Sequence, residues 1–496
     1  MEELPEALFS TAQVLDIERR ATSGPVTEPL MERAGRSVLT LLRGRWPRAR
    51  RVTVICGPGN NGGDGYVAAR LAREAGMAVQ VLSPAPHVRL QGDAAHARGR
   101  LLAAGVAVEP FSAGALGAAD VVVDALFGTG LQRPVEGEWL AAVRAINACG
   151  VPVLSVDLPS GLDADSGRIL GEAVRADVTL CMIVLKPGLF TGFGRECCGE
   201  ICHAGLDVPA GISAAVMPAA RRIVPANLRH LLHPRPRHAH KGGAGRVLVV
   251  GGGPGMGGAA HLAGVAAYRA GAGLVTVATH PAHAACLAQG RPELIVHGVD
   301  GPAGLEVLLE RADVIAAGPG LGQDRWAQEL WAVLRTVERP LVVDADALNL
   351  LAATAFVRQD WILTPHPGEA ARLLGWSAAD VQNDRFAALR QITRRYGGTC
   401  ILKGSGSLVW GGGDEPVWLC DRGNPGMASG GMGDVLTGII AGLQAQGLPA
   451  LHAARMGVWC HAAAADAAVR RDGERGLLAL DLLPRVRVLV NELARA

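Results

Sequence analysis

One short segment, NPGMASGGMGDVLTGIIAGL (residues 424–443), places a single carboxylate, Asp434, directly after a glycine-rich turn and before an apolar stretch. The apolar stretch predicts a helix, and the turn presents the successive backbone N–H groups of residues 430–433 at the start of that helix. Such groups hold the negative charge that develops on a phosphoryl group during its transfer. Asp434 stands where a hydroxyl must lose its proton as that group arrives. The segment therefore predicts a general base beside an anion hole.

A helix N-cap is the simpler interpretation of Asp434, because aspartate is among the preferred cap residues. A cap alone does not require three glycines in the four preceding positions. We therefore favour the anion hole over the cap.

Polar side chains also follow several predicted strands in the first half of the chain. Asn60, Asn61 and Asp64 lie in the turn of GPGNNGGDGYVAARL, although asparagine and aspartate are common in turns for conformational reasons alone. Two further strand ends carry Asp124 in VVVDALFGTGL, and Asp157 and Ser160 in SVDLPSGLDAD. The carboxyl ends of parallel strands converge on one edge of a sheet, where ligands bind. Asn61, Asp124 and Ser160 would there present hard oxygen ligands to a cation.

The elements that must position these residues can be predicted from hydrophobic runs. In the first half, strand-like runs cover residues 51–56, 78–83, 119–126, 151–157 and 176–182, and they alternate with amphipathic stretches such as YVAARLAREAG (66–76). In the second half, strand-like runs cover residues 245–251, 273–280, 312–320, 340–346, 361–367, 399–406 and 407–410. This alternation predicts an α/β fold in each half, with a parallel sheet covered on both faces.

The pattern is interrupted by RRIVPANLRHLLHPRPRHAHKG (221–242), which gathers arginines, histidines and prolines without a clear period. A nucleic-acid-binding arm is one interpretation, but a solvated linker fits one short basic patch better. The length of 496 residues exceeds a single ordinary core, which stops at about 250 residues. We therefore expect a first domain over 1–220, a linker over 221–240 and a second domain over 241–496. The halves share no long repeat, which indicates a fusion rather than a duplication.

Composition and charge exclude several classes of protein. A net charge of +2 favours neither nucleic acid nor a membrane surface as a partner, and no segment offers about 20 apolar residues free of glycine and charge. The acidic, amphipathic first twenty residues are unlike a signal peptide, so a cytoplasmic protein is expected. The cluster CCGEICH (197–203) lacks a second cysteine pair at zinc-finger spacing, which favours buried thiols over a zinc site.

Two glycine-rich turns formally match the dinucleotide-binding motif. GPGNNG (57–62) and GPGMGG (253–258) match G-x-G-x-x-G, but neither following strand ends in the acid that would bind a ribose hydroxyl. A redox dinucleotide domain is therefore disfavoured, and no P-loop motif is present. Both turns could still hold phosphates through their backbone N–H groups.

The first half resembles the NAD(P)H-hydrate epimerase domain over roughly residues 1–215. The resemblance rests on CGPGNNGGDGYVAARLA, DALFGTGLQRPVEG, SVDLPSGLDADSG and LKPGLFTGFGRECCGEICHAGLDVP. It implies a Rossmann-like three-layer α/β sandwich and a substrate site for hydrated nucleotide. The residues implied to line that site are Asn60, Asn61, Gly62, Gly63, Asp64, Gly128, Thr129, Gly130, Leu131, Gln132, Arg133, Pro134 and Asp157. It also implies a potassium ion held by Asn61, Asp124 and Ser160.

The implied reaction inverts carbon 6 of the reduced nicotinamide ring, which carries a hydroxyl beside the ring nitrogen. Opening and closing through an iminium-type species needs a group that exchanges protons near the hydroxyl. We assign that role to Asp157. Lys186 in LKPG is a weaker candidate, because a lone lysine after a strand is more often structural.

The second half resembles the NAD(P)H-hydrate dehydratase domain, a ribokinase-like α/β fold in which the G-x-G-D aspartate is the base. The resemblance rests on AAGPGLGQ, LVVDADALNLL, LTPHPGEAARLLG, ILKGSGSLV and the opening segment, and covers nearly all of residues 235–490. It implies that the adenosine nucleotide is bound by Lys403, Gly404, Ser405, Gly406, Ser407 and Gly433. It implies substrate contacts from Ala259, Gly320, Gly322, His366 and Asp434, although a histidine between prolines can simply cap a turn.

The implied second reaction transfers a phosphoryl group to the ring hydroxyl, with Asp434 as proton acceptor, and then expels phosphate as the ring double bond returns. The fused layout favours ADP over ATP as the donor, giving AMP and phosphate, although no single residue distinguishes the two nucleotides. Mg²⁺ is expected because phosphoryl transfer needs charge neutralisation. The expected substrates are therefore the hydrates NADHX and NADPHX together with ADP.

Two other interpretations are kept. A ribokinase-like vitamin-precursor kinase fused to a nucleotide-binding module would release a stable phosphorylated product, although LTPHPGE is untypical of such kinases. Alternatively, the first half is only a binding module whose potassium site is inert. The resemblance alone also suggests a homo-oligomer.

Overall fold

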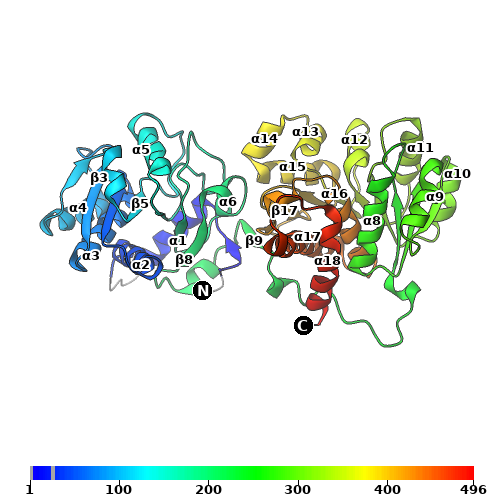
Figure 1. Ribbon diagram of the computed structural model, residues 1–496, viewed down its shortest axis with the longest axis horizontal. Helices are drawn as coiled ribbons and strands as arrows, with labels where there is room; N and C mark the ends of the chain where they lie inside the picture. The colour runs from blue at the N-terminus through cyan, green and yellow to red at the C-terminus, as the bar shows by residue number, and fades with distance from the viewer. Residues whose placement is uncertain (1–3, 24–27, 496) are drawn as a thin grey trace. The chain divides into compact units, whose positions relative to one another are not determined.

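The computed structural model describes residues 4–23 and 28–495, and the chain forms two compact units, Met1–Arg221 and Arg222–Ala496 (Figure 1). No helix in the described ranges combines the length and apolar character needed to span a membrane.

The first unit is built on a parallel sheet with the strand order β4-β3-β2-β5-β6-β7-β8. Its strands are β2 (Arg51–Cys56), β3 (Ala78–Ser83), β4 (Val108–Pro110), β5 (Val121–Ala125), β6 (Val153–Val156), β7 (Val178–Met182) and β8 (Glu200–Ala204). Outside this sheet, β1 (Ala7–Leu8) pairs with β9 (Ala220–Arg222) in antiparallel register.

Helices cover both faces of this sheet, as the alternation of the strand residues requires. The helices are α1 (Thr11–Thr22), α2 (Leu30–Arg45), α3 (Asn60–Glu74), α4 (Gly92–Ala103), α5 (Gly137–Ala148), α6 (Gly194–Cys197) and α7 (Ala210–Ala214), with 3-10 turns η1 (Ala113–Ala118) and η2 (Pro187–Leu189). On β5, Val121 and Val123 enter the core formed with α1 to α4, whereas Val122 enters the core formed with α5 and η1. The period of two therefore yields the expected three-layer sandwich.

The second unit is built on a larger sheet with the order β18-β17-β16-β15-β14-β13-β10-β11-β12, parallel except where β17 pairs with β16 and β18. Its strands are β10 (Arg246–Val250), β11 (Leu274–Thr279), β12 (Ile295–Gly298), β13 (Val314–Ala317), β14 (Leu341–Val343), β15 (Trp361–Leu363), β16 (Thr399–Leu402), β17 (Ser407–Trp410) and β18 (Val417–Cys420).

The helices of the second unit fall into two groups. The first group, α8 (Gly257–Ala270), α16 (Met432–Gln444), α17 (Ala450–Asp472) and α18 (Ala479–Ala494), shares one large core with the sheet. The others are α9 (Pro281–Gly290), α10 (Pro302–Leu309), α11 (Arg325–Leu334), α12 (Ala345–Ala353), α13 (Pro367–Leu374), α14 (Ala378–Asn383) and α15 (Arg385–Tyr396), with η3 (Pro225–Asn227), η4 (Lys241–Ala244) and η5 (Pro425–Met427).

The range proposed as a linker contains ordered structure. Residue 221 lies in β9, η3 follows, and Ile223 and Leu228 are fully buried in the core of the second unit. Apolar residues spaced among the arginines and prolines thus pack on that unit.

Candidate active sites

A cavity of 1200 Å³ opens at the carboxyl edge of the sheet in the first unit. Its walls come from the start of α3 after β2, from the loop after β5, from Asp157 after β6, from Met182 at the end of β7, and from α1 and α2. Ligand sites of α/β sheets lie at this edge because the strand ends and their loops meet there. Asn60, Asn61, Asp64 and Asp157, predicted from separate strand ends, therefore share one cavity, whereas Asp124 and Ser160 are not among its lining residues.

Most of the residues predicted to contact substrate in this unit line the cavity. They are Asn60, Asn61, Asp64, Gly128, Thr129, Gly130, Leu131, Gln132, Arg133 and Asp157. Gly62, Gly63 and Pro134 are not among the lining residues. A side chain at Gly62 would come within 2.0 Å of the carbonyl oxygen of Gly57, and one at Gly63 would meet the side chain of Met31. These two glycines therefore let the start of α3 pack closely on its neighbours.

The asparagine-rich segment differs from its sequence-based prediction in one respect. Residues 60–64, expected to lie inside a turn, form the first turn of α3, whose N-cap is Gly59. The predicted helix began at residue 66 because the glycines at positions 62, 63 and 65 disfavour a helix by propensity. Close packing against neighbouring segments outweighs that propensity here. The side chains of Asn60, Asn61 and Asp64 are thereby held at the positive end of a helix.

Asp157 occupies a strained position beside the cavity. Its φ is 66°, a left-handed conformation that non-glycine residues rarely adopt away from functional sites. Its carboxylate accepts hydrogen bonds from the Thr129 hydroxyl at 2.7 Å and from the Met182 backbone N–H at 3.1 Å, and it forms an ion pair with Lys186. Burial alone would raise the pKa of Asp157, but the Lys186 charge and these donors hold the pKa below its usual value.

Lys186 supports Asp157 from the protein interior. The residue is only 1% exposed, and its ammonium also donates to the carbonyl oxygen of Met182 at 3.0 Å and to Sγ of Cys181 at 3.4 Å. Burial lowers the pKa of Lys186, but the neighbouring Asp157 carboxylate and Cys181 outweigh burial and raise it. The pair is therefore ionised, with the carboxylate toward the cavity.

Two further carboxyl groups line the same cavity with the opposite shift. Burial, followed by the negative charge of Asp157, raises the pKa of Asp64 well above its usual value and also raises the pKa of Glu18. The cavity thus combines a carboxylate whose pKa is lowered, Asp157, with two carboxyl groups whose pKa is raised. Glu18 was not predicted, because its position in the amphipathic helix α1 gives no sign that the helix closes over the strand ends.

Of the three residues predicted as cation ligands, Asp124 and Ser160 are joined by hydrogen bonds, and Asn61 is not hydrogen-bonded to either of them in the described structure. Asp124 is fully buried and accepts from the Ser160 hydroxyl at 2.6 Å, the Ser160 backbone N–H at 2.9 Å and the Ser155 hydroxyl at 2.8 Å. Asn61 lies against the loop after β5, because a side chain at Gly128 would come within 3.3 Å of its amide group, and the Phe127 N–H of that loop donates to the Ser160 hydroxyl oxygen at 2.8 Å. Burial raises the pKa of Asp124 even though these donors lower it.

In the second unit, Asp434 is the third residue of α16, and Gly431 is the N-cap with a φ of 86°. Asp434 is therefore not the N-cap of this helix. The first intrahelical hydrogen bond of α16 joins the Val435 N–H to the Gly431 carbonyl oxygen. The N–H groups before it have no partner of this kind and are available to an anion.

Close packing of α16 on α8 fixes the position of this turn, and Figure 1 shows the two helices side by side. A side chain at Gly438 would come within 2.0 Å of the Ala263 carbonyl oxygen, and one at Gly442 within 2.5 Å of the Ala267 carbonyl oxygen. Two glycines one helical turn apart thus let the helix backbones approach directly. A side chain at Gly431 would likewise meet Leu262 at 2.6 Å.

A buried polar network supports Asp434 from below. Asp344 is almost completely buried and accepts from Thr364 at 2.8 Å, from Thr437 of α16 at 2.9 Å and from the Lys403 ammonium at 2.7 Å. Burial would raise the pKa of Asp344, but Lys403 and these hydroxyls lower it. Gly433 lies over the ion pair, because a side chain there would stand 3.4 Å from both charged groups. Asp344 was not predicted as a site residue, because its partners Lys403 and Thr437 are distant in the chain.

Asp434 itself is half-buried and surrounded by other carboxylates. Burial raises the pKa of Asp434 to about 6, with further upward contributions from Asp344, Asp346 and Glu369 that exceed what Lys403 offsets. This pKa lies close to that of an effective general base near neutral pH.

The predicted nucleotide-binding loop, Lys403 to Ser407, follows β16 and rests on a buried arginine. Arg385, at the start of α15, is 1% exposed and donates to the carbonyl oxygens of Leu402, Lys403 and Gly406. Gly404, with a φ of 136°, has no room for a side chain, because one would meet the Arg385 guanidinium at 2.8 Å. Burial lowers the pKa of Arg385 to about 10. Arg385 was not predicted, because it lies 18 positions before the loop residue Lys403 that it supports.

His366 is the N-cap of α13, and its Nδ1 accepts from the Gly368 backbone N–H at 2.9 Å. The capping role therefore holds, and it leaves Nε2 3.5 Å from Glu369 Oε1. Glu369 is buried, accepts from the His366 backbone N–H at 2.7 Å, and its Oε2 lies 3.7 Å from the Lys403 ammonium. The HPGE segment thus places an imidazole and a carboxylate at the edge of the Asp344–Lys403 network.

The remaining predicted substrate contacts lie on two glycine-rich loops. Gly320 follows β13 in a left-handed conformation, and a side chain there would meet Ala259 of α8 at 3.0 Å. The Gly322 N–H donates to Asp346, which in turn acts on the pKa of Asp434. Ala259, Gly320 and Gly322 are therefore neighbours of the Asp434 region, at the carboxyl ends of β10 and β13.

Comparisons with known proteins agree with this two-part architecture. A family model described as NAD(P)H-hydrate dehydratase matches residues 247–486, and one described as YjeF-related protein N-terminus matches residues 27–188. The bifunctional NAD(P)H-hydrate repair enzyme of Coxiella burnetii is 46% identical over 485 residues, which cover 98% of this chain and 99% of the relative. This chain belongs to the family of bifunctional NAD(P)H-hydrate repair enzymes.

Solved structures match the second unit of this repair-enzyme chain. A ribokinase-like superfamily protein from Enterococcus faecalis is 29% identical, with a TM-score of 0.53, and the match covers 57% of this chain and 99% of the other. An ADP/ATP-dependent NAD(P)H-hydrate dehydratase from Bacillus subtilis, co-crystallised with ATP and Mg²⁺, is 29% identical, with a TM-score of 0.50 and coverage of 54% and 97%. The second unit is therefore ribokinase-like.

The potassium ion expected for a hydrate-repair enzyme fits the first site. Both amide atoms of the buried Asn61 side chain lack a hydrogen-bond partner in the described structure. An unsatisfied buried oxygen is unfavourable, and a cation ligated by it would remove the cost. Asp124 adds a buried carboxyl group whose hydrogen-bond donors are neutral hydroxyl and amide groups. Both features suit a cation with oxygen ligands.

The second site would hold Mg²⁺ only together with the phosphate groups of a bound nucleotide. Within residues 4–23 and 28–495, no three His, Cys, Asp or Glu side chains gather so as to hold a metal ion. Mg²⁺ is commonly held by one or two carboxylates together with substrate phosphates. Lys403 offsets part of the negative charge of Asp344, Glu369 and Asp434, and a nucleotide-borne divalent cation would add to that charge balance.

Proposed function

We propose that this chain performs both steps of NAD(P)H-hydrate repair. The first unit interconverts the R and S epimers of NADHX and NADPHX, and the second dehydrates the S epimer to NADH or NADPH at the expense of ADP. The observation that carries the proposal is the placement of Asp434 above the Asp344–Lys403 pair at an open helix N-terminus, in a chain that matches a bifunctional repair enzyme over its full length.

In the first unit, the hydrated ring would lie against Asp157, with the nucleotide contacting Asn60, Asn61, Asp64 and the loop of residues 128–133. Ionised Asp157 accepts the proton of the C6 hydroxyl as the C6–O double bond forms and the C6–N1 bond breaks, with its electron pair going to the ring nitrogen. When the nitrogen adds to the other face of that carbonyl carbon, Asp157 returns the proton to the oxygen. Thr129 and Lys186 hold the carboxylate in place. Asp64, with its raised pKa, carries the second exchangeable proton. Potassium, bound by Asn61, Asp124 and Ser160, would supply positive charge near the nucleotide.

In the second unit, Asp434 accepts the proton of the C6 hydroxyl while that oxygen forms a bond to the terminal phosphorus of ADP and AMP leaves. The N–H groups of residues 430–433 hold the charge on the phosphoryl oxygens. The C6–O bond then breaks, phosphate departs with the electron pair, and a proton leaves C5 as the double bond forms. Expelling phosphate is easier than expelling hydroxide, which explains the consumption of a nucleotide.

The nucleotide would be bound by the loop from Lys403 to Ser407 and by Gly433, and the substrate by Ala259, Gly320, Gly322 and His366. ADP is proposed as the donor. The Bacillus subtilis dehydratase, described as ADP/ATP-dependent and crystallised with ATP and Mg²⁺, supports an adenine nucleotide with Mg²⁺. We place the two activities in residues 1–220 and 241–496.

The test incubates the full chain with the mixed epimers of NADHX, Mg²⁺, K⁺ and either ADP or ATP, and follows the absorbance of the restored dihydronicotinamide. Complete recovery with ADP, with equimolar AMP and phosphate, is the expected outcome. A phosphorylated product that accumulates would instead identify the kinase alternative. Recovery that stops at the S fraction would refute the epimerase assignment alone.

A further inference from the structure

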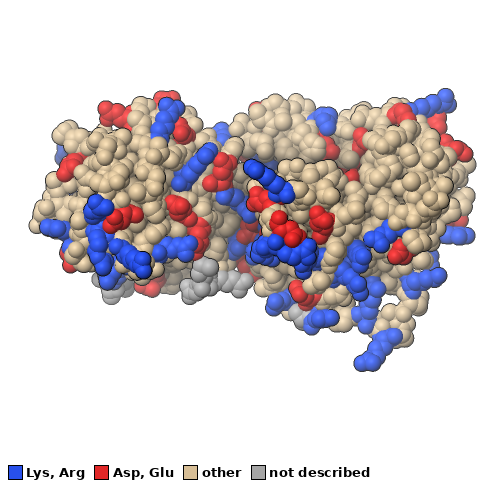
Figure 2. All heavy atoms as spheres, in the orientation of Figure 1, with Lys and Arg blue, Asp and Glu red and all other residues tan. Residues whose placement is uncertain are grey.

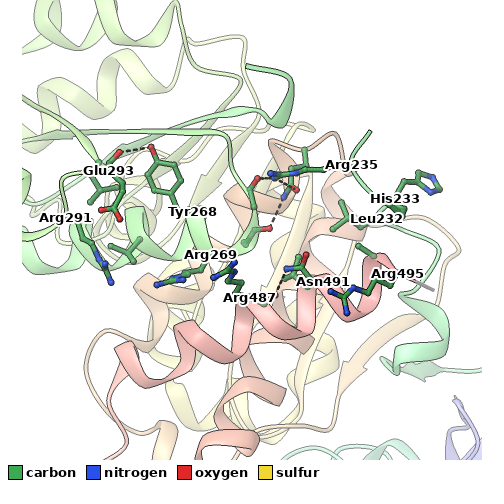
Figure 3. A pocket seen from close by; sticks show the side chains of 18 residues that line it. Leu232, His233, Arg235, Tyr268, Arg269, Arg291, Glu293, Arg487, Asn491 and Arg495 are labelled. Carbon is green, nitrogen blue, oxygen red and sulfur yellow. Dashed lines mark hydrogen bonds between the residues drawn. The ribbon is translucent and has the colours of Figure 1, made fainter. Parts of the chain in front are cut away.

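A second cavity, of 680 Å³, lies within the second unit, and no residue assigned above to nucleotide or substrate lines it. Its walls come from residues 232–235, the end of α8, the segment before β12, the turn after α16 and the last turns of α18 (Figure 3). Gly271 and Leu294 precede β11 and β12, so the cavity lies at the amino edge of the sheet. Asp434 and its neighbours lie at the carboxyl edge, and the two sites are therefore separate.

Positive charge converges on this cavity from several segments. Four lining arginines, Arg269 of α8, Arg291, Arg487 of α18 and Arg495, have no side-chain hydrogen bond or ion pair in the described structure. Glu293 is the only acidic residue among the lining residues. Figure 3 shows these side chains around one space, and Figure 2 shows Lys and Arg gathered on the face around α18. Unpaired guanidinium groups that converge in this way repel one another and favour an anion between them.

Apolar packing and hydrogen bonds hold the walls of the arginine-lined cavity in place. Val265, Leu294 and Val490 form an apolar floor that is continuous with the core of the unit. Tyr268 donates its hydroxyl to the Glu293 carbonyl oxygen at 2.8 Å. Arg235 donates to the Gly271 carbonyl oxygen and to Gln446 Oε1, which holds residues 232–235 over the cavity. The volume lies within the range of about 300–1000 Å³ that small-molecule sites occupy.

Three of these arginines have an alternative role as cations that stabilise helix C-termini. Arg269 lies in the last turn of α8, and Arg291 and Arg495 are the C-caps of α9 and α18. A cation at a helix C-terminus stabilises the helix. That role accounts for each arginine singly, but not for Arg487, which lies inside α18, nor for the shared cavity.

We propose that the arginine-lined cavity binds a small molecule that carries several phosphate groups. Guanidinium groups bind phosphate oxygens through paired hydrogen bonds, and four of them from different segments match a chain of phosphates better than a single anion. The apolar floor leaves room for an attached ring. Because the cavity lies at the opposite edge of the sheet from Asp434, its ligand does not compete with the nucleotide of the phosphoryl-transfer site.

The test measures chemical labelling of individual arginines in the full chain by phenylglyoxal, read by peptide mass spectrometry. Inorganic tripolyphosphate is the probe, and Arg311, which is exposed and has no side-chain partner in the described structure, is the internal control. At ten times its dissociation constant, bound tripolyphosphate should slow the labelling of Arg269 and Arg487 about tenfold by mass action. Arg311 should be labelled at the same rate with and without the probe. Equal rates at the cavity arginines would overturn the proposal.

Charge reversal provides the matched variants. In R269E/R487E the probe should no longer slow the labelling of Arg291, whereas in R311E the protection should persist. Protection of Arg291 that survives in R269E/R487E would refute the shared site. Circular dichroism and the thermal midpoint report whether each variant folds, and if R269E/R487E does not fold, the wild-type labelling decides. ATP in place of tripolyphosphate then measures whether a ring adds to the affinity.

Discussion

At the scale of single residues, Asp434 is placed where ionisation is unfavourable, and this gives a prediction that separates catalysis from stability. Asp434→Asn should lower the dehydration rate by about 10²–10⁴-fold, because a positioned base contributes that much. Since its pKa is raised to about 6, ionised Asp434 costs stability at neutral pH. The amide should therefore increase the free energy of unfolding, by on the order of 1 kcal/mol after solvent screening.

The measurement pairs the absorbance assay on the S epimer with urea unfolding. Asp414→Asn, at an exposed position in the same unit, is the control and should change neither quantity. A D434N protein that keeps the wild-type rate would remove Asp434 from the mechanism.

The same residue predicts a pH profile. Asp434 must be ionised to accept a proton, so kcat/KM for dehydration should fall as pH drops below about 6. Stability moves in the opposite direction, because a raised pKa makes the protonated form the favoured one in the folded state. The profile is measured with the S epimer at saturating ADP. A rate that stays level from neutral pH to about one unit below the pKa of Asp434 would contradict the assignment.

In the first unit, the buried pair of Asp157 and Lys186 predicts a different combination. Asp157→Asn should abolish epimerisation and also destabilise the unit by about 3–5 kcal/mol, because it leaves the Lys186 charge buried without a partner. The double variant D157N/K186M should recover stability but not activity. Epimerisation is followed by the nuclear magnetic resonance signals of the two epimers.

The pair also sets an acid limit. Because the pKa of Asp157 is lowered in the folded state, the pair stabilises the unit above the ordinary aspartate pKa, and this contribution is lost as pH falls through the lowered value. Active D157N/K186M would show that the pair is only structural.

At the scale of elements, the contact of α16 with α8 determines where Asp434 stands. Gly438→Ala places a methyl group 2.0 Å from the Ala263 carbonyl oxygen, so the helices must separate. The variant should lose about 1–3 kcal/mol of stability, the usual cost of overpacking, and its dehydration rate should fall while epimerisation is unchanged. Gly304→Ala in α10, where the nearest atom is 3.4 Å away, is the control, and thermal unfolding with both assays gives the comparison. Equal effects of the two substitutions would mean that the contact does not position α16.

Some strands and helices could be predicted from the sequence, and others could not. Buried strands such as β2, β5 and β10 were predicted from largely apolar runs, since both of their faces are covered. The short strands β4, β8 and β12, largely half-buried or exposed, were missed because they lack such runs. β18, a buried apolar run of four residues, was missed as well. The start of α3 was missed because glycine propensity argued against a helix that close packing permits.

The candidate sites were readable only where their residues are neighbours in the chain. Asn60, Asn61 and Asp64, or Gly433 and Asp434, lie in recognisable motifs. Asp344, by contrast, is joined to Lys403 and Thr437 across 59 and 93 positions, and Arg385 supports a loop 18 positions away through carbonyl oxygens. The packing of the sheet brings such distant partners together, so they cannot be predicted from the positions of the residues in one sequence.

At the scale of the whole molecule, the two chemistries are consecutive, because the product of epimerisation is the substrate of dehydration. A dehydratase specific for the S epimer clears only part of a mixed pool unless the R epimer is converted. Each compact unit holds a complete set of its own proposed catalytic groups, with Asp157 and Lys186 in one and Asp434, Asp344 and Lys403 in the other. The intermediate can therefore pass between molecules.

This leads to a complementation prediction. With mixed epimers and ADP, D157N should restore only the S fraction of NADH, and D434N should restore almost none while still interconverting the epimers. An equimolar mixture of the two variant proteins should restore the whole pool, because R hydrate converted on D434N is released and dehydrated on D157N. The absorbance amplitude, rather than the rate, is the readout, so the loss of stability predicted for the first unit of D157N does not obscure it. If the mixture restores no more NADH than D157N alone, the S hydrate does not leave the chain on which it forms. The fusion of the two units would then serve to pass the hydrate directly from one active site to the other.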